Sequence, residues 1–323
     1  MSAGLSARLV AVTRSPVVRL GFLVLAVGLA VVAVVSARDE LADAVVALSP
    51  GALVAALVLG AGYVWFTLLA WRAVLADLGS TLSLGTSTTV FGLGQIGKYV
   101  PGGVWNVVAA AELGADHQVP RSRSLAAMAV ATLVGLVSGC VIGAVALAAS
   151  ADDLGSWRWA AWAAPLTVLL LAPQVLNRVV AFVLRLARRP APEHELTARG
   201  MLVAVGWSLA GWVLAGLHLV VLAADLGMEL SWRTVALCVG GYAAAWVAGF
   251  LVIVVPAGAG AREAALLLLL AGSLTHGAVL LTVLVSRVLL TLVDLAFAGA
   301  GYVALRQWRR GSRLAPQGNE PVP

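Results

Sequence analysis

The sequence contains an internal repeat whose two copies lie 148 residues apart. The tetrapeptide Ala-Asp-Leu-Gly at 76–79 recurs at 224–227, and in each copy Leu-Ser follows after two further residues. The same offset aligns three apolar runs: 17–36 with 165–184, 51–75 with 199–223, and 124–150 with 272–298. An accidental match is the alternative in a chain so rich in Ala, Leu and Val, but Asp is scarce here. Duplicated apolar segments favour two related membrane halves, an arrangement typical of transporters.

The composition excludes a soluble globular protein. Hydrophobic residues make up 61% of the 323 residues, charged residues make up 11%, and the mean hydropathy is +0.99. Such a chain has too few polar side chains to cover a soluble surface. A helix needs roughly 20 apolar residues to cross a bilayer, and the chain has six full-length candidates with no strand-like alternation. We therefore expect an all-α polytopic membrane protein whose run 17–36 is an uncleaved first span.

The distribution of charge predicts the topology. Basic residues cluster at the N-terminus, at Arg121 and Arg123, from 185 to 199, and from 306 to 313. Acidic residues mark the connections at 39–43, 152–153 and 225–229. If the stretches 84–112 and 232–272 each crossed the membrane once, two of the basic clusters would be external, against the positive-inside rule. The sequence therefore predicts two re-entrant helical hairpins at about 84–112 and 232–272, besides the six spans.

These spans and hairpins give an inverted-topology repeat in the inner membrane, with both termini cytoplasmic. The first repeat covers 1–157, the second covers 158–308, and 309–323 is a short cytoplasmic tail. The net charge of +6 lies at the ends of segments, so it indicates topology and contact with anionic lipid rather than nucleic acid. Cys140 and Cys238 lie in apolar stretches and are interpreted as inert core thiols. The four histidines are scattered, so no metal site is expected.

Each hairpin has residues that break a helix. The first contains Pro101, Gly102 and Gly103, and the second contains Pro256, Gly258 and Gly260. Proline removes a backbone donor and glycine releases the chain from helical dihedral angles. Irregular backbone at membrane depth is tolerated only against protein or water, so both turns should line a shared cavity. A half-helix restarting near Trp105 would direct its positive end into that cavity. The alternative is that both segments are ordinary loops.

Ionisable residues within apolar segments are the candidate binding residues, because an unpaired charge there is unfavourable. The candidates are Lys98, Glu112, Arg262, Glu263, Arg287 and Asp294. The three cations should bind an anionic head group. The three acids either balance those cations, receive a cationic aminoacyl group, or form salt bridges that fix helix packing. Arg287 and Asp294 are seven residues apart on one helical face, so each needs a partner elsewhere. Tyr99 and Trp105 flank the first turn and either line the cavity or pack.

The two turn motifs resemble a known family. The matching segments are Gly-Lys-Tyr-Val-Pro-Gly-Gly-Val-Trp at 97–105, Pro-Ala-Gly-Ala-Gly-Ala-Arg-Glu at 256–263, and Arg287 in the last span. They are similar to the lysylphosphatidylglycerol synthase transmembrane-region family of flippase-like proteins. The resemblance implies a polytopic inner-membrane protein that corresponds to the flippase portion of the full synthases. Those synthases also have an aminoacyl-transferase domain, which we do not expect here, so lipid aminoacylation is not expected. Gly103 stands where the family often has a basic residue.

The expected function is therefore that of a flippase-like transporter with membrane lipids as partners. It would move a phospholipid or a polyprenyl-phosphate-linked lipid through a cavity between the two hairpins, without enzyme activity and without a cofactor. No ATP-binding motif occurs, so transport would be downhill or coupled to an ion or the membrane potential. A homo-oligomer is left open. The alternatives are a polyprenyl-phosphate-dependent glycosyltransferase, with a base at Asp39 or Glu40, and a non-transporting scaffold.

Overall fold

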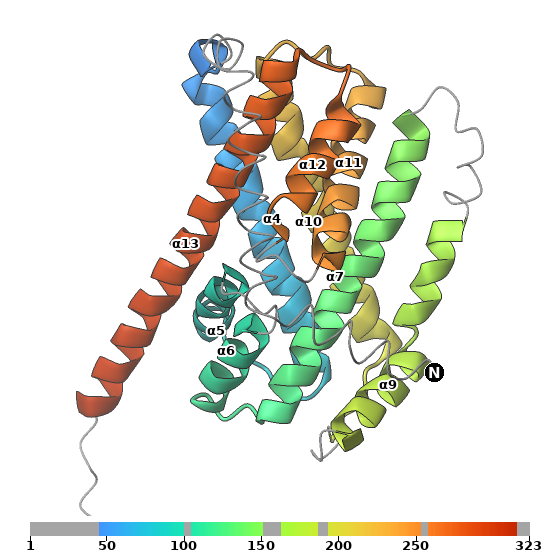
Figure 1. The fold of residues 1–323 in the computed structure, drawn as a ribbon. Coiled ribbons are helices and arrows are strands. Elements are labelled where there is room, and N and C mark those ends of the chain that lie inside the picture. Colours follow the sequence, from blue (N-terminus) through green and yellow to red (C-terminus); the bar gives the residue numbers. More distant parts are fainter. Residues whose placement is uncertain (1–44, 100–104, 151–162, 187–192, 253–257, 315–323) are drawn as a thin grey trace, which may run out of the picture.

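The computed structural model describes residues 45–99, 105–150, 163–186, 193–252 and 258–314, and these form an all-α polytopic membrane protein (Figure 1). The named elements, in chain order, are α4 (Pro50–Asp77), α5 (Leu84–Ile96), η1 (Gly97–Tyr99), α6 (Trp105–Ala115), α7 (Arg121–Ser150), η3 (Ala164–Leu171), α9 (Pro173–Leu186), α10 (Ala198–Asp225), α11 (Trp232–Leu251), α12 (Ala261–Leu270) and α13 (His276–Leu314). The expected span 17–36 and the expected boundary between the halves at 157 and 158 lie outside the described residues.

Five of the described helices are long and apolar enough to cross a membrane: α4, α7, α10, α11 and α13. A sixth candidate is the pair η3 and α9, which is bent by 60°. The sequence predicts one span over 165–184, and the structure instead breaks it at Ala172 and Pro173. Proline cannot donate the backbone hydrogen bond that would continue the helix, and its ring clashes with the preceding turn. Helix α13 also continues to Leu314, into the segment expected to be a tail.

Helices α4 and α10 reproduce the sequence repeat residue for residue. Each has 28 residues, and the offset of 148 takes Pro50 to Ala198 and Asp77 to Asp225. The next helices, α5 and α11, begin at Leu84 and at Trp232, which are related by the same offset. The two long helices run antiparallel against each other (Figure 1). The segment from α4 to the start of α5 and the segment from α10 to the start of α11 are therefore inverted copies of each other.

Two equivalent hydrogen-bonded contacts, which we call the clasps, join the ends of this antiparallel pair. The backbone N–H and the hydroxyl of Ser49, the N-cap of α4, donate to the Asp225 carboxylate at 2.6 and 2.9 Å. The backbone N–H and the hydroxyl of Thr197, the N-cap of α10, donate to the Asp77 carboxylate at 2.7 and 2.8 Å. Each hydroxyl also caps its own helix. The repeated Asp is thus explained, because each helix ends on the residue that secures the start of the other.

The repeated glycine ends both helices in the same way. Gly79 has a φ of 88° and Gly227 a φ of 97°, values that glycine adopts without steric cost. In each copy the glycine N–H and the following N–H donate back to carbonyls of the last helical turn. This is the Schellman arrangement, which satisfies the free carbonyls at a helix C-terminus. The tetrapeptide of the sequence repeat is therefore a helix-ending signal used twice.

Both predicted hairpins turn back on themselves, although α11, the first arm of the second hairpin, is also long and apolar enough to cross a membrane. The α5–η1–α6 hairpin begins and ends at one end of the bundle, and the α11–α12 hairpin begins and ends at the other end (Figure 1). The two arms of each hairpin come into close contact at a glycine. A Cβ at Gly97 would lie 2.4 Å from the backbone N of Asn106, and a Cβ at Gly258 would lie 2.8 Å from the backbone of Gly249. Only hydrogen fits at these contacts, so the glycines determine how tightly each hairpin closes.

Each hairpin packs against the last long helix of the opposite half. A Cβ at Gly92 of α5 would lie 2.5 Å from the carbonyl oxygen of Phe297 in α13. At the equivalent position in α11, a Cβ at Gly240 would lie 2.8 Å from the backbone N of Leu147 in α7. Small residues let membrane helices approach backbone to backbone. The two halves are therefore interlocked through their hairpins.

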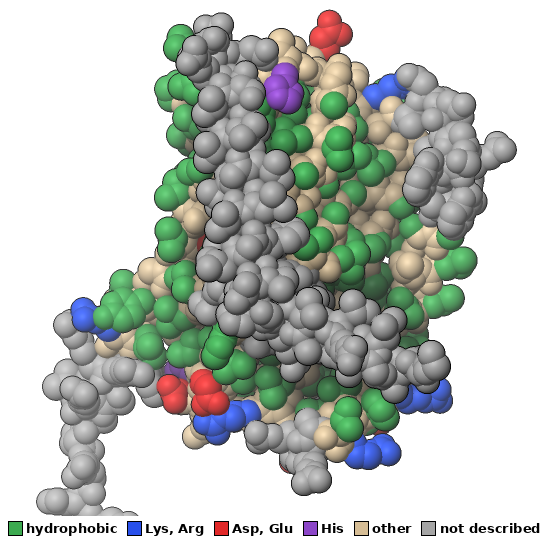
Figure 2. Space-filling view, viewed as in Figure 1, with side chains coloured by type: hydrophobic (Ala, Val, Ile, Leu, Met, Phe, Trp, Pro, Cys, Tyr) green, Lys and Arg blue, Asp and Glu red, His purple; other side chains and the backbone are tan. Residues whose placement is uncertain are grey.

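The basic ends of the helices gather at one end of the bundle. Helices α4, α9 and α13 end there, α7 and α10 begin there, and most of the visible Lys and Arg side chains lie at that end (Figure 2). Arg123 of α7 is largely buried and donates to the carbonyl of Gly79 and the hydroxyl of Ser80, at 3.0 and 2.8 Å. Arg123 thus also anchors α7 to the end of α4.

We predict that the two clasps stabilise the fold independently. Asp77→Ala and Asp225→Ala should each remove two hydrogen bonds to an N-cap and lower the midpoint of thermal unfolding by about 2–4 °C. Because the clasps lie at opposite ends of a 28-residue helix pair, the double variant should show the sum of the two effects. Fluorescence-detected size exclusion after heating in detergent measures this. Glu229→Ala, at an exposed carboxylate, is the control. Midpoints equal to that control would contradict the stabilising role.

Candidate functional site

The candidate site is built on one face of α13. Asp294 is 3% exposed, and its Oδ2 accepts a hydrogen bond from the Tyr99 hydroxyl at 2.6 Å and pairs with the Lys98 Nζ at 2.6 Å. Lys98 and Tyr99 belong to the short helix η1 at the tip of the first hairpin. A buried carboxylate needs such partners, because burial of an unpaired charge is strongly unfavourable. The tip of the first hairpin is thereby fixed to α13 of the second half.

The second hairpin contacts the same face of α13 through an ion pair in which α13 supplies the cation, Arg287, and the hairpin supplies the anion, Glu263. The Arg287 Nε lies 3.5 Å from the Glu263 Oε1. The other oxygen of Glu263 accepts the backbone N–H of Gly260 at 2.5 Å, at the start of α12. Glu263 therefore places an anion at a helix N-terminus, where the helix dipole favours it. Arg287 and Asp294 each meet a different hairpin, in agreement with their seven-residue spacing.

Arg262 is the third cation of the site and is held differently. Its guanidinium lies over the ring of Tyr242, at 4.4 Å from the centroid. Within the described ranges it has no hydrogen bond or ion pair, although it lies within electrostatic range of Glu263, Arg287 and Asp294. Lys98 is in turn within range of Arg262 and Arg287. We call Lys98, Arg262, Glu263, Arg287 and Asp294 the charge cluster.

The charge cluster is partly accessible. The side chain of Lys98 is 32% exposed and that of Arg287 is 26% exposed. Arg262 is also half-buried, whereas Asp294 lies beneath. A cation over an aromatic ring is stabilised without losing its hydrogen-bond donors. The cluster can therefore present guanidinium donors to an anion from outside.

The structure places the other predicted site residues in different ways. Trp105 opens α6 with its indole half-exposed, and its backbone contacts the tip at Gly97. Gly258 and Gly260 shape the second tip with φ values of 67° and 86°. Glu112 instead makes a bidentate pair with Arg121, at 2.9 and 2.7 Å, near the basic end. Pro101, Gly102, Gly103 and Pro256 lie outside the described residues.

Sequence reasoning missed the aromatic and polar layer behind Arg262. Tyr242 is fully buried and contacts the rings of Tyr63, Trp212 and His218. The His218 Nε2 lies 2.7 Å from the hydroxyl of Ser286, the residue that precedes Arg287 in the chain. The chain has only four tyrosines, and a Tyr in an apolar helix needs a partner for its hydroxyl. The rarity of Tyr was the available signal. The repeat gives no further signal, because the offset of 148 relates none of the four ring residues to another of them.

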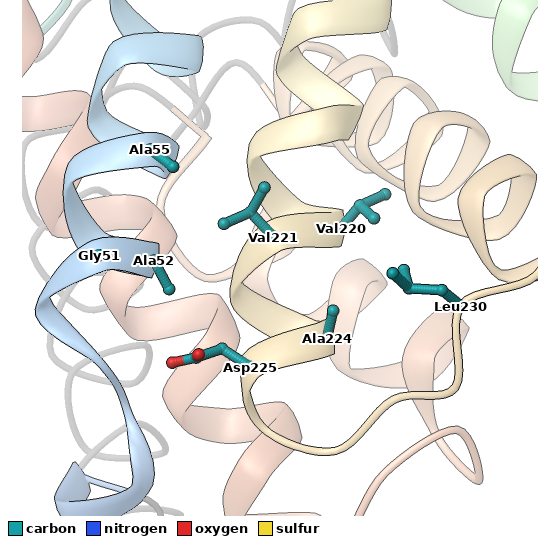
Figure 3. A pocket seen from close by; sticks show the side chains of 8 residues that line it. All are labelled: Gly51, Ala52, Ala55, Val220, Val221, Ala224, Asp225 and Leu230. Atoms are coloured by element: carbon teal, nitrogen blue, oxygen red, sulfur yellow. The ribbon is translucent and has the colours of Figure 1, made fainter.

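A separate groove lies between the start of α4 and the end of α10 (Figure 3). Its lining residues are Gly51, Ala52, Ala55, Val220, Val221, Ala224, Asp225 and Leu230. Asp225 is the only charged residue among them, and its carboxylate already binds Ser49. This groove therefore offers no free donor to a head group, and the charge cluster is the better candidate.

Comparison with known families now decides the identity. The sequence matches the family described as Lysylphosphatidylglycerol synthase TM region over residues 19–298. The chain belongs to this family. Both re-entrant hairpins and the whole charge cluster lie within the matched residues. The comparison with curated proteins gives no match. The family membership and the apolar helices establish a multi-pass membrane protein.

We predict that Gly258 determines the shape of the second tip of this family member. In Gly258→Ala the new Cβ would meet the backbone of Gly249 at 2.8 Å and the backbone would keep a positive φ. Gly272→Ala has the same dihedral penalty at a φ of 83°, but nothing lies within 4 Å of its Cβ. We therefore expect a larger loss of thermal stability for Gly258→Ala, measured by size exclusion after heating. Equal losses in the two variants would show that the close contact is unimportant.

Proposed function

We propose that this protein transports an anionic lipid across the membrane, with the phosphate of the head group bound at the charge cluster. The observation that carries the proposal is Arg262, a membrane-embedded guanidinium held against Tyr242 with its donors unused among the described residues. An ionisable residue within the membrane implies a function unless it is paired. Guanidinium matches phosphate oxygens in a bidentate fashion, so phosphate is the favoured ligand.

The position of the cluster supports transport. It lies where the tips of two inverted re-entrant hairpins meet α13, and inverted repeats of transporters place their substrate sites between discontinuous helices near the midplane. The head group would bind there while the acyl chains stay in lipid. Lys98 and Arg287 are each paired with a carboxylate, so Arg262 would be the main contact of the phosphate. Both are partly accessible.

We also propose an orientation. The end of the bundle that carries Arg121, Arg123, Arg185 and Arg199 faces the cytoplasm of a bacterial-type inner membrane, in line with the positive-inside rule. The Asp225 clasp then lies at the external face. Both termini would be cytoplasmic. Reaction of single cysteines introduced at Asp116 and at Glu229 with a membrane-impermeant thiol reagent tests this orientation.

We propose that the protein acts without enzyme activity. The glycosyltransferase alternative depends on Asp39 and Glu40, which lie outside the described residues, and the scaffold alternative would leave the charge cluster without a use. Neither gains support from a specific contact. If the transport assay described next is negative for every lipid, these two alternatives replace transport as the candidate functions.

The proposal is tested by transport in liposomes. Purified protein reconstituted with fluorescent phosphatidylglycerol should accelerate its transbilayer movement, followed by dithionite quenching. Arg262→Ala should slow this movement at least about tenfold, because it removes charge-assisted hydrogen bonds to the phosphate. The matched control is Arg306→Ala. Arg306 also lies over a tyrosine, Tyr302, at 4.8 Å, but outside the cluster.

The outcomes separate the alternatives. Movement that is lost in Arg262→Ala and retained in Arg306→Ala supports transport through the cluster. Equal rates in the wild type and both variants would remove the site assignment. Rates no faster than those of empty vesicles, for phosphatidylglycerol and for polyprenyl phosphate alike, would sink the transport function itself.

A further inference from the structure

We infer that the charge cluster selects a lipid with a single negative charge, a phosphodiester, over lipids that carry a diphosphate. The inference deepens the proposed function and rests on it. It follows from how the five charges are paired, which determines how many negative charges a bound head group can neutralise.

Four of the five charges already neutralise each other. Lys98 and Asp294 form a pair at 2.6 Å, and Arg287 and Glu263 form a second pair at 3.5 Å. Each pair joins a hairpin tip to α13. Asp294 also accepts from Tyr99, and Glu263 also accepts from Gly260, so each carboxylate has a hydrogen-bond donor besides its cation. An entering anion would have to break these bonds to reach Lys98 or Arg287.

Arg262 supplies the one net positive charge of the cluster. Its ring contact with Tyr242 stabilises the cation without neutralising it. His218 contacts a hydroxyl and a backbone carbonyl rather than a carboxylate, so we count it as neutral. The hairpin segments 100–104 and 253–257 contain no ionisable residue in the sequence. Among the described residues, three cations and two carboxylates therefore leave a single positive charge for the ligand.

A second observation points to the same place. The hydroxyl of Tyr242 is buried and has no hydrogen-bond partner within the described part of the chain. Buried polar groups are normally hydrogen-bonded. Because Arg262 lies over the same ring, this hydroxyl and the guanidinium are donors from neighbouring groups. Both groups can donate hydrogen bonds to phosphate oxygens.

The charge balance then discriminates between ligands. In a site of low dielectric constant an unbalanced charge is more unfavourable than in water. One phosphodiester neutralises Arg262 and leaves both pairs intact. A diphosphate brings more than one negative charge, so it leaves an excess beside Glu263 and Asp294. Those two carboxylates are therefore the specificity-determining residues, because each holds one cation away from the ligand.

The test compares lipids that share dioleoyl chains. Purified protein in nanodiscs of phosphatidylcholine, a net-neutral phosphodiester, binds fluorescent phosphatidylglycerol, and unlabelled phosphatidylglycerol or dioleoylglycerol diphosphate competes. We expect the wild type to prefer phosphatidylglycerol about tenfold. Asp294→Asn and Glu263→Gln each release one cation, so each should shift the preference toward the diphosphate. Two variants keep the test valid if one fails to fold, which size exclusion reports. Soluble glycerol 3-phosphate should not compete, and competition equal to that of the lipids would exclude a lipid head group.

The matched control is Glu112→Gln. It also removes one carboxylate from an ion pair, with Arg121, but that pair lies outside the cluster. It should leave the preference unchanged. Equal or tighter binding of the diphosphate by the wild type, or shifts in the cluster variants no larger than in Glu112→Gln, would overturn the inference and leave the anionic-lipid site standing. Absence of competition by either anionic lipid would instead overturn the proposed function.

Discussion

The antiparallel contact between α4 and α10 is the interaction on which the rest of the structure depends. Each helix ends on a carboxylate that binds the N-cap of the other, through Asp225 with Ser49 and through Asp77 with Thr197. The pairing is reciprocal under one offset, so it generates a two-fold relation between the halves. The hairpins that follow α4 and α10 then start at opposite ends of the bundle. Both tips meet α13, the first at Asp294 and the second at Arg287.

The charged residues of the candidate site do not follow the two-fold relation between the helices. Helix α13 carries Arg287 and Asp294 toward the tips, whereas the offset places Gly139 and Ala146 at the equivalent positions of α7. The glycine contact of α7 packs against Trp212 instead. The second half therefore supplies four of the five charges of the cluster, and the first half supplies Lys98. A single site results, rather than two related ones.

The sequence predicted the frame better than the site. Repeat spacing, proline and glycine placement, and charge distribution act locally, so they predicted the inverted halves and both re-entrant hairpins. They also singled out Lys98, Arg262 and Asp294, because charges are conspicuous in apolar helices. The bend at Pro173 was missed because hydropathy alone defined that span. The Arg121 partner of Glu112 and the contact of Arg262 with Tyr242 depend on how separate helices pack, and no local pattern encodes that.

The two ion pairs of the charge cluster differ in which parts of the molecule they join. Helix α5 packs backbone to backbone on α13 at Gly92, so the Lys98–Asp294 pair lies at a contact between the two halves. The Glu263–Arg287 pair, in contrast, lies within the second half. An anion that competed for Lys98 would weaken the contact between the halves, whereas one that competed for Arg287 would loosen only the second tip. A phosphodiester bound at Arg262 leaves both pairs intact, so the Lys98–Asp294 pair would keep the first hairpin tip on α13 while the site is occupied.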